Sequence, residues 1–113
     1  MRSLLVLALL IIGMGPASAG TGSAEPKGVQ LFARECGICH GEAGFGTMML
    51  ERRLGKERSL LRERSDLLPV YIKTVVRRGL SSMPPLSRVE ISDPDLDAII
   101  TYLTRPQAAR RHE

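Results

Sequence analysis

The sequence has few large residues from which to build a hydrophobic core. Its 113 residues include no tryptophan, two phenylalanines and two tyrosines. A chain of this length forms one domain. Small domains bury a modest fraction of their surface, and many rely on a disulfide, a metal or a cofactor for stability. The scarcity of aromatic residues therefore leaves room for a cofactor at the centre of the domain.

The sequence also lacks a large excess of positive or negative charge. Sixteen basic residues stand against 12 acidic ones, which gives a net charge of +4. This surplus is small, and aromatic residues do not alternate with basic ones as in nucleic-acid-binding surfaces. We therefore expect no nucleic-acid partner.

No hydrophobic run is long enough to span a membrane. The longest, Leu4–Ile12, falls short of the roughly 20 apolar residues that a transmembrane helix needs. Arg2 precedes it, and Ala17-Ser18-Ala19 follows with the small residues that signal peptidase recognises. The pattern predicts a cleaved signal peptide over residues 1–19, export to the periplasm, and a mature domain over residues 20–113 without a transmembrane segment. An uncleaved membrane anchor is the alternative.

Only two cysteines, Cys36 and Cys39, are present. A disulfide between them closes a loop too short to stabilise the fold appreciably. A structural zinc needs about four ligands, and there is no second cysteine pair. A redox Cys-x-x-Cys remains an alternative, although it is typical of a strand–helix–strand pattern and no convincing strand is visible.

A histidine directly follows the second cysteine, so the segment is Cys36-Gly37-Ile38-Cys39-His40. Cys-x-x-Cys-His is the motif that attaches haem c covalently. The two thiols form thioethers with the haem vinyl groups, and the adjacent imidazole can bind the iron. The sequence therefore predicts one covalent haem c, held by Cys36 and Cys39, with His40 as an axial ligand.

Around this motif the chain resembles a class I c-type cytochrome. The segment Gly28–Phe32 resembles the N-terminal helix of that family, and Met83-Pro84 resembles its distal-ligand loop. The resemblance implies an all-α domain of about three to five helices around one covalent haem. It also implies that the first and last helices cross, with Phe32 near Tyr102.

A narrower resemblance covers the second half of the chain. It is carried by Tyr71-Ile72-Lys73, Val76-Arg77, Gly79 and Met83-Pro84. These residues resemble the small cytochrome subunits of p-cresol methylhydroxylases. That likeness implies a flavoprotein of the vanillyl-alcohol oxidase type as the electron donor.

Hydrophobic periodicity places the helices. The apolar spacing of Leu68, Ile72, Val75 and Val76 predicts a helix that begins at Pro69 and ends at Gly79. Leu96, Ile99, Ile100 and Leu103 predict a last helix, with Asp93 as its N-cap. A first helix should begin near Pro26 and end at the haem motif. The stretch 41–47 is predicted as a loop, and 48–66 as one or two short helices broken at Gly55.

Four side chains are candidates for the second axial ligand: Met48, Met49, Met83 and His112. Met48 and Met49 follow His40 closely and are expected to pack against the haem or the core. His112 lies in a charged tail. Met83 stands in a loop stiffened by Pro84 and Pro85, and the resemblance carries the distal-ligand role to Met83.

The sequence predicts the other surroundings of the haem less specifically. Apolar walls are expected from Leu31, Phe45, Leu50, Ile72, Val75, Val76, Leu86 and Ile99. Many class I cytochromes have proline after Gly-x-Gly, and its carbonyl accepts the N–H of the proximal histidine, but Thr47 stands there in this chain. Which carbonyl orients His40 is left open. Arg52 and Arg53 are candidates for neutralising a haem propionate, with a solvated helix face as the alternative.

The leading functional hypothesis is a periplasmic one-electron carrier, not an enzyme. A second cytochrome or an oxidase is the expected electron acceptor, and the basic residues between 52 and 64 are candidates for steering an acidic partner. The first alternative is a sensor or peroxidase-like protein with an open distal haem site. The others are a thiol-disulfide oxidoreductase and a structural interaction module.

Overall fold

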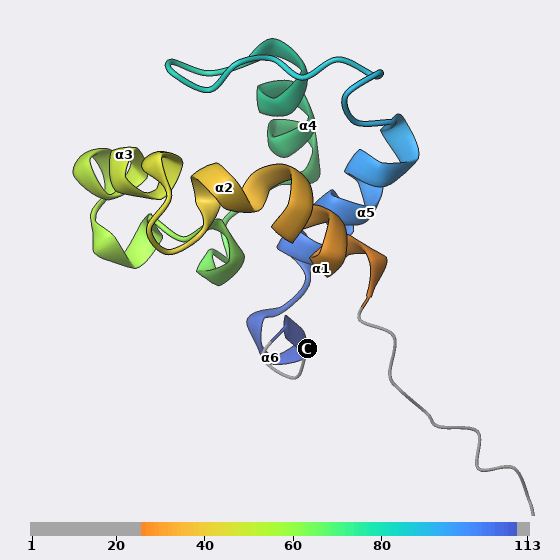
Figure 1. Ribbon diagram of the computed structural model, residues 1–113. Helices are drawn as coiled ribbons and strands as arrows, with labels where there is room; N and C mark the ends of the chain where they lie inside the picture. The colour runs from red at the N-terminus through yellow and green to blue at the C-terminus, as the bar shows by residue number, and fades with distance from the viewer. Residues whose placement is uncertain (1–25, 111–113) are drawn as a thin grey trace, which may run out of the picture.

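The structure is a computed structural model that describes residues 26–110, so the predicted signal peptide lies outside the described residues. The described chain is helical and contains no β-strand (Figure 1). Helix α1 (Lys27–Leu31), the π-helical turn η1 (Phe32–Cys36) and α2 (Gly37–His40) follow one another without a break. The remaining elements are α3 (Phe45–Leu54), the 3-10 turns η2 (Lys56–Arg58) and η3 (Leu61–Glu63), α4 (Pro69–Arg78), α5 (Asp93–Thr104) and α6 (Gln107–Arg110). The all-α prediction is confirmed.

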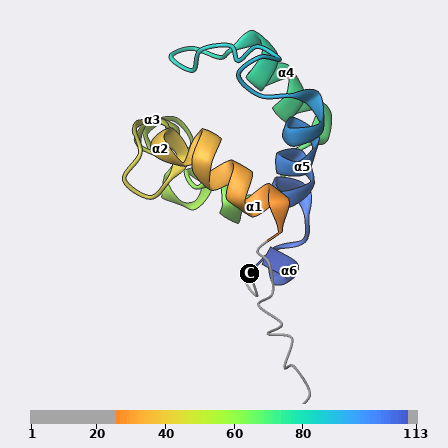
Figure 2. The ribbon, with the colours of Figure 1, turned by 45° about the vertical axis from the view of Figure 1, so that its right-hand side comes forward.

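The first helical run crosses α5, as the two views in Figures 1 and 2 show. The crossing is close because Gly28 has no side chain. A Cβ at this position would lie 2.4 Å from the carbonyl oxygen of Ala98 and 2.8 Å from the Cβ of Tyr102. One turn further on, the rings of Phe32 and Tyr102 pack with their centroids 5.7 Å apart. The crossing and this ring contact confirm what the cytochrome resemblance implied.

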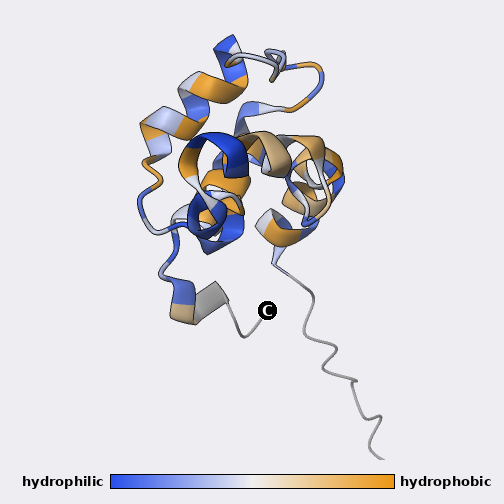
Figure 3. Cartoon of the chain, turned by 90° about the vertical axis from the view of Figure 1, so that its left-hand side faces the viewer, coloured by the Kyte–Doolittle hydropathy of each residue, from blue (hydrophilic) through white to orange (hydrophobic). Residues whose placement is uncertain are grey.

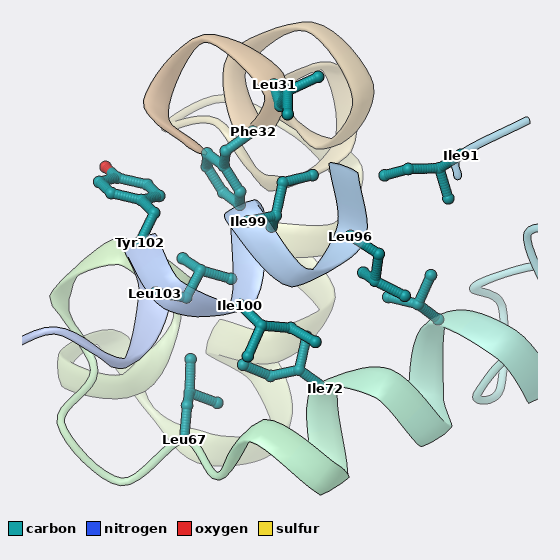
Figure 4. Close-up of a cluster of buried hydrophobic side chains, with 11 residues drawn as sticks. Leu31, Phe32, Leu67, Ile72, Ile91, Leu96, Ile99, Ile100, Tyr102 and Leu103 are labelled. Carbon is teal, nitrogen blue, oxygen red and sulfur yellow. The ribbon is translucent and has the colours of Figure 1, made fainter. Parts of the chain in front are cut away.

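The hydrophobic core gathers around α5. Helix α5 contributes five buried residues to it, and the first helical run contributes Leu31 and Phe32. In Figure 4, Phe32 lies between Tyr102 and Ile99, and Ile72 from α4 approaches Ile100. Among residues 26–110, only Leu96 and Ile99 are large side chains that are fully buried. Figure 3 shows hydrophobic and hydrophilic residues alternating along the helices, as expected for elements with one buried face.

Two predicted boundaries near the haem motif are wrong. The first helix does not end at the motif but continues through it to His40, by way of the π-helical turn. Such turns occur often at functional sites. Helix α3 begins at Phe45, inside the predicted loop, because Gly44 adopts an extended conformation and caps the first turn.

Two predictions about α4 and α5 also need correction. Leu68, assigned to the buried face of α4, is 62% exposed because it lies before the helix begins. The N-cap of α5 is Ser92 and not Asp93, since the Ser92 hydroxyl accepts a hydrogen bond from the N–H of Asp95. The Asp93 carboxylate is engaged elsewhere, by Arg77 and Arg88.

The predicted helix terminators are confirmed. Gly55 after α3 and Gly79 after α4 both have positive φ, at 86° and 76°. Glycine adopts such angles without strain. Between residues 26 and 110, no helix has the length and apolar character needed to cross a bilayer.

Candidate functional site

One cavity of about 400 Å³ lies between α2, α3, α4, the loop after α4 and α5. Its volume falls within the roughly 300–1,000 Å³ typical of cofactor and ligand sites. Seven of the eight predicted wall residues line it: Phe45, Leu50, Ile72, Val75, Val76, Leu86 and Ile99. Leu31 does not; it packs in the core instead. The fold thus leaves an apolar space at the position where the sequence predicts a cofactor.

The predicted attachment residues all line this cavity. Helix α2 carries Cys39 and His40, and Cys36 ends the preceding π-helical turn. Both cysteines are free thiols, Cys36 partly buried and Cys39 exposed. The helical conformation places the two sulfurs and the imidazole on neighbouring turns beside the same space.

Burial controls the ionisation of Cys36. Its pKa is raised to about 11, mainly by desolvation, with further contributions from the negative charges of Glu35 and Cys39. The thiol is therefore protonated at neutral pH. Redox-active Cys-x-x-Cys sites rely on the opposite, a thiolate stabilised by a lowered pKa. This environment argues against the thiol-disulfide oxidoreductase alternative.

His40 has the properties of a metal ligand. Burial lowers the pKa of its imidazole, so the ring is neutral at pH 7, the form that binds metals. The ring lies against α3: a Cβ at Gly46 would be 3.0 Å from Cε1 and 3.1 Å from Nδ1 of His40. Glycine at position 46 therefore lets α3 lie this close to the His40 ring.

The orienting partner of His40 was left open by the sequence. In the described part of the chain, the Nδ1 of His40 is buried and no carbonyl accepts a hydrogen bond from it. Thr47, in place of the proline of many class I cytochromes, also has a buried hydroxyl without a partner. The Nδ1 of His40, a residue of the cavity wall, and the hydroxyl of Thr47 therefore have unused hydrogen-bonding capacity within residues 26–110.

Of the candidate distal ligands, Met49 and Met83 line the cavity. Met48 does not line it and is 43% exposed. His112 lies outside the described residues. Met83 is partly buried against the core, and its backbone exchanges two hydrogen bonds with Leu80, of 2.9 and 3.0 Å.

Two arginines reach the cavity. Arg53 lines it and donates a hydrogen bond of 3.2 Å to the Ser81 hydroxyl, whereas Arg52 is exposed and does not line it. Arg64 also lines the cavity and pairs with Asp66 at 2.8 Å. Sequence reasoning missed Arg64, because nothing in a basic stretch distinguishes it from its neighbours. It also missed the contact between Gly46 and His40.

The residues around the cavity fit a covalently attached haem. Apolar walls suit the porphyrin faces, Arg53 suits a propionate, and two thiols adjoin a neutral imidazole beside the same space. No group of three or more His, Cys, Asp or Glu side chains able to hold a bare metal ion occurs among residues 26–110.

Comparison with known proteins agrees with this chemistry. The family model described as cytochrome c oxidase, cbb3-type, subunit III matches residues 23–103. No curated protein and no solved structure gives a significant match. The match covers most of the chain, including the Cys-x-x-Cys-His motif and Met83. The chain belongs to this family of class I c-type cytochromes, and it is an electron-transfer protein with covalently bound haem c.

Proposed function

We propose that this protein is a periplasmic one-electron carrier whose haem is bound by Cys36 and Cys39 and whose iron is ligated by His40 and Met83. One observation carries the proposal: these four side chains border the same apolar cavity. The haem supplies an iron that alternates between the ferric and ferrous states. The chain supplies the ligands, excludes water and provides a docking surface.

The choice of Met83 over Met49 follows from the elements that carry them. Met49 lies on α3, the helix whose Gly46 packs against the His40 ring. It therefore belongs to the His40 side of the site. Met83 comes from the separate loop between α4 and α5, which suits a ligand on the opposite face.

These residues favour a raised reduction potential. A thioether ligand opposite histidine stabilises ferrous iron. The apolar walls act in the same direction, since the extra charge of ferric haem is costly in a low-dielectric site. Arg53, at the cavity, would offset the negative charge of a propionate, whereas the charge of Arg64 is already paired with Asp66.

The axial ligand assignment is tested by Met83→Ala. Met coordination gives ferric haem c a weak far-red absorption band, and we expect this variant to lose the band, bind carbon monoxide readily when reduced and show a lower potential. The matched control is Met49→Ala, which also removes a methionine from the cavity and should keep the band. Absorption spectra of periplasmically expressed protein provide the measurement.

Other outcomes would change the assignment. Loss of the band in Met49→Ala alone would transfer the ligand role to Met49. A wild-type haem protein without the band would favour the open-site sensor or peroxidase-like alternative. A chain that stays colourless in a host with haem c maturation would contradict the proposal altogether.

The electron donor is proposed on the resemblance to p-cresol methylhydroxylase cytochrome subunits: a flavoprotein of the vanillyl-alcohol oxidase type. A second cytochrome or an oxidase would take the electron onward. The predicted signal peptide supports the periplasmic location. The resemblance runs from Tyr71 to Leu103, and the residues that carry it, from Tyr71 to Pro84, lie in α4 and the start of the loop after it.

The basic stretch offers less unpaired charge for steering than its composition indicates. Arg58 and Arg64 both pair with Asp66, and Arg62 pairs with Glu42 at 2.6 Å. Arg52 and Lys56 are exposed, and their side chains have no ion-pair partner within residues 26–110.

If this stretch attracts an acidic donor, Arg52→Glu/Lys56→Glu should slow electron transfer several-fold at low salt. The effect should shrink as ionic strength rises, because salt screens exposed charges. Stopped-flow kinetics at two salt concentrations measure it, with Arg52→Lys/Lys56→Arg as the charge-preserving control. Equal rates for both double variants at low salt would exclude steering by this stretch.

A further inference from the structure

Arg77, in the last turn of α4, joins three parts of the fold through one guanidinium group. Its Nη1 donates to the carbonyl oxygens of Leu86 and Ser87, at 3.0 and 2.9 Å. Its Nη2 donates to the carbonyl oxygen of Ile91 at 2.9 Å and to Oδ1 of Asp93 at 2.8 Å. The side chain is only 15% exposed. Four charge-assisted hydrogen bonds thus tie α4 to the loop after Met83 and to the start of α5.

Few other side-chain contacts hold that loop: Arg53 donates a hydrogen bond to the Ser81 hydroxyl at 3.2 Å, and Arg88 pairs with Asp93 at 2.7 Å. Between residues 80 and 90, only Met83 and Leu86 are partly buried, and Val89 is 96% exposed. Pro84 and Pro85 have no N–H to donate. The one backbone hydrogen bond that ties the loop to α4 runs from the N–H of Leu86 to the carbonyl oxygen of Val76, at 2.8 Å. Burial therefore does not fix the loop, and the guanidinium of Arg77 makes three of the hydrogen bonds that hold residues 86–91.

The start of the loop packs closely against the end of α4. A Cβ at Gly79 would lie 2.7 Å from the carbonyl oxygen of Met83 and 3.0 Å from the nitrogen of Pro85. The backbone at Met83 therefore runs directly against the end of α4. Holding the later part of the loop against Arg77 keeps Met83 in this position, at the edge of the cavity.

We propose that Arg77 is a positioning residue for Met83: by clamping residues 86–91 to α4 and α5, it keeps the thioether on the haem iron. This inference rests on the proposed ligand role of Met83. Arg77 itself does not touch the iron. Its hydrogen bonds lower the free energy of the loop conformation in which Met83 ligates the iron, relative to conformations in which Met83 has left it.

The test compares Arg77→Lys and Arg77→Met with the same changes at Arg78. Arg78 is the adjacent residue of α4, is exposed, and makes no side-chain hydrogen bond or ion pair with residues 26–110. Lysine keeps the positive charge at position 77 but cannot make four planar hydrogen bonds. Arg88 still pairs with Asp93 at 2.7 Å in these variants, so that carboxylate keeps a partner.

The probe is imidazole, which binds ferric iron only after the methionine has left. Losing several charge-assisted hydrogen bonds should make imidazole bind to the Arg77 variants about tenfold more tightly or more. Hydrogen exchange of the Leu80, Met83 and Leu86 amides should accelerate in parallel. The Arg78 variants should match the wild type in both measurements.

The outcomes separate this inference from the ligand assignment. Equal imidazole affinity and equal amide exchange in the Arg77 and Arg78 variants, with the Met–iron band present in the wild type, would overturn the role of Arg77 alone. A wild-type protein without that band would overturn the Met83 assignment, and this inference with it. If Arg77→Met does not fold, Arg77→Lys decides between these outcomes.

Discussion

A chain in which Cys36 and Cys39 are both replaced by serine is expected to lose covalent haem and then to lose its fold. The cavity beside them occupies about 400 Å³ and is lined mainly by apolar side chains. Left empty, such a space costs about 24 cal/mol per Å³, or roughly 10 kcal/mol as an upper bound for a cavity that is partly open. Small domains have only about 5–15 kcal/mol of stability. In the part of the chain that the structure describes, the core around α5 has just two large, fully buried side chains to compensate.

Haem staining after denaturing electrophoresis measures the covalent attachment, and thermal unfolding followed by far-ultraviolet circular dichroism measures the fold. The double serine variant, washed free of non-covalent haem, should show no stain and no cooperative transition. The single variant Cys39→Ser provides the control, because one thioether can still retain the haem. A haem-free double variant that unfolds cooperatively at the wild-type temperature would show that the cofactor is not part of the core.

The second large effect is expected at the helix crossing, from Gly28→Ala. The new Cβ would meet the Ala98 carbonyl oxygen at 2.4 Å and the Tyr102 Cβ at 2.8 Å. Both belong to a packed helix, so α1 and α5 must move apart. Overpacking of this kind costs about 1–3 kcal/mol and sometimes more. Because the first contact is with backbone, we expect a value at the upper end and a loss of the Phe32–Tyr102 packing.

A destabilisation at the upper end of that range should lower the Tm of the haem-loaded protein by more than about 10 °C, since each kcal/mol shifts the Tm of a domain of this size by about 4–8 °C. Intrinsic propensity predicts the opposite sign, because alanine is better than glycine within a helix. The matched control is Gly37→Ala in α2, where a Cβ would meet only the Phe32 carbonyl oxygen, at 3.7 Å. If Gly28→Ala proves as stable as Gly37→Ala, the close approach of α1 to α5 is not rigid.

Local signals in the sequence were sufficient for much of the architecture. The terminators Gly55 and Gly79 were predicted correctly because a positive φ depends on the residue itself. The buried face of α5 followed from its 3.6-residue period, and Leu96, Ile99, Ile100 and Leu103 are all buried. The all-α class and the haem attachment motif were predictable for the same reason, since each is a pattern within a short segment.

Local sequence preferences did not predict every helix boundary. Asp93 is a good N-cap by type, but Ser92 caps α5, because Arg77 and Arg88 draw the Asp93 carboxylate away from the helix end. The helix through Cys36 continues as a π-helical turn, which no residue pattern predicted. In both cases a preference of the isolated segment was overridden by what packs beside it.

The sequence by itself determined the cofactor chemistry, through two thiols and an imidazole at fixed spacing, and the apolar face of α5. Tertiary structure decided which side chains meet around the cofactor. It brought Met83 and Met49 to the cavity but not Met48, placed Gly46 against His40, and set Arg77 between α4 and the distal loop. These contacts join residues far apart in the chain or depend on how one helix faces another. Their distances are therefore set by the packing around α5, and no local pattern encodes them.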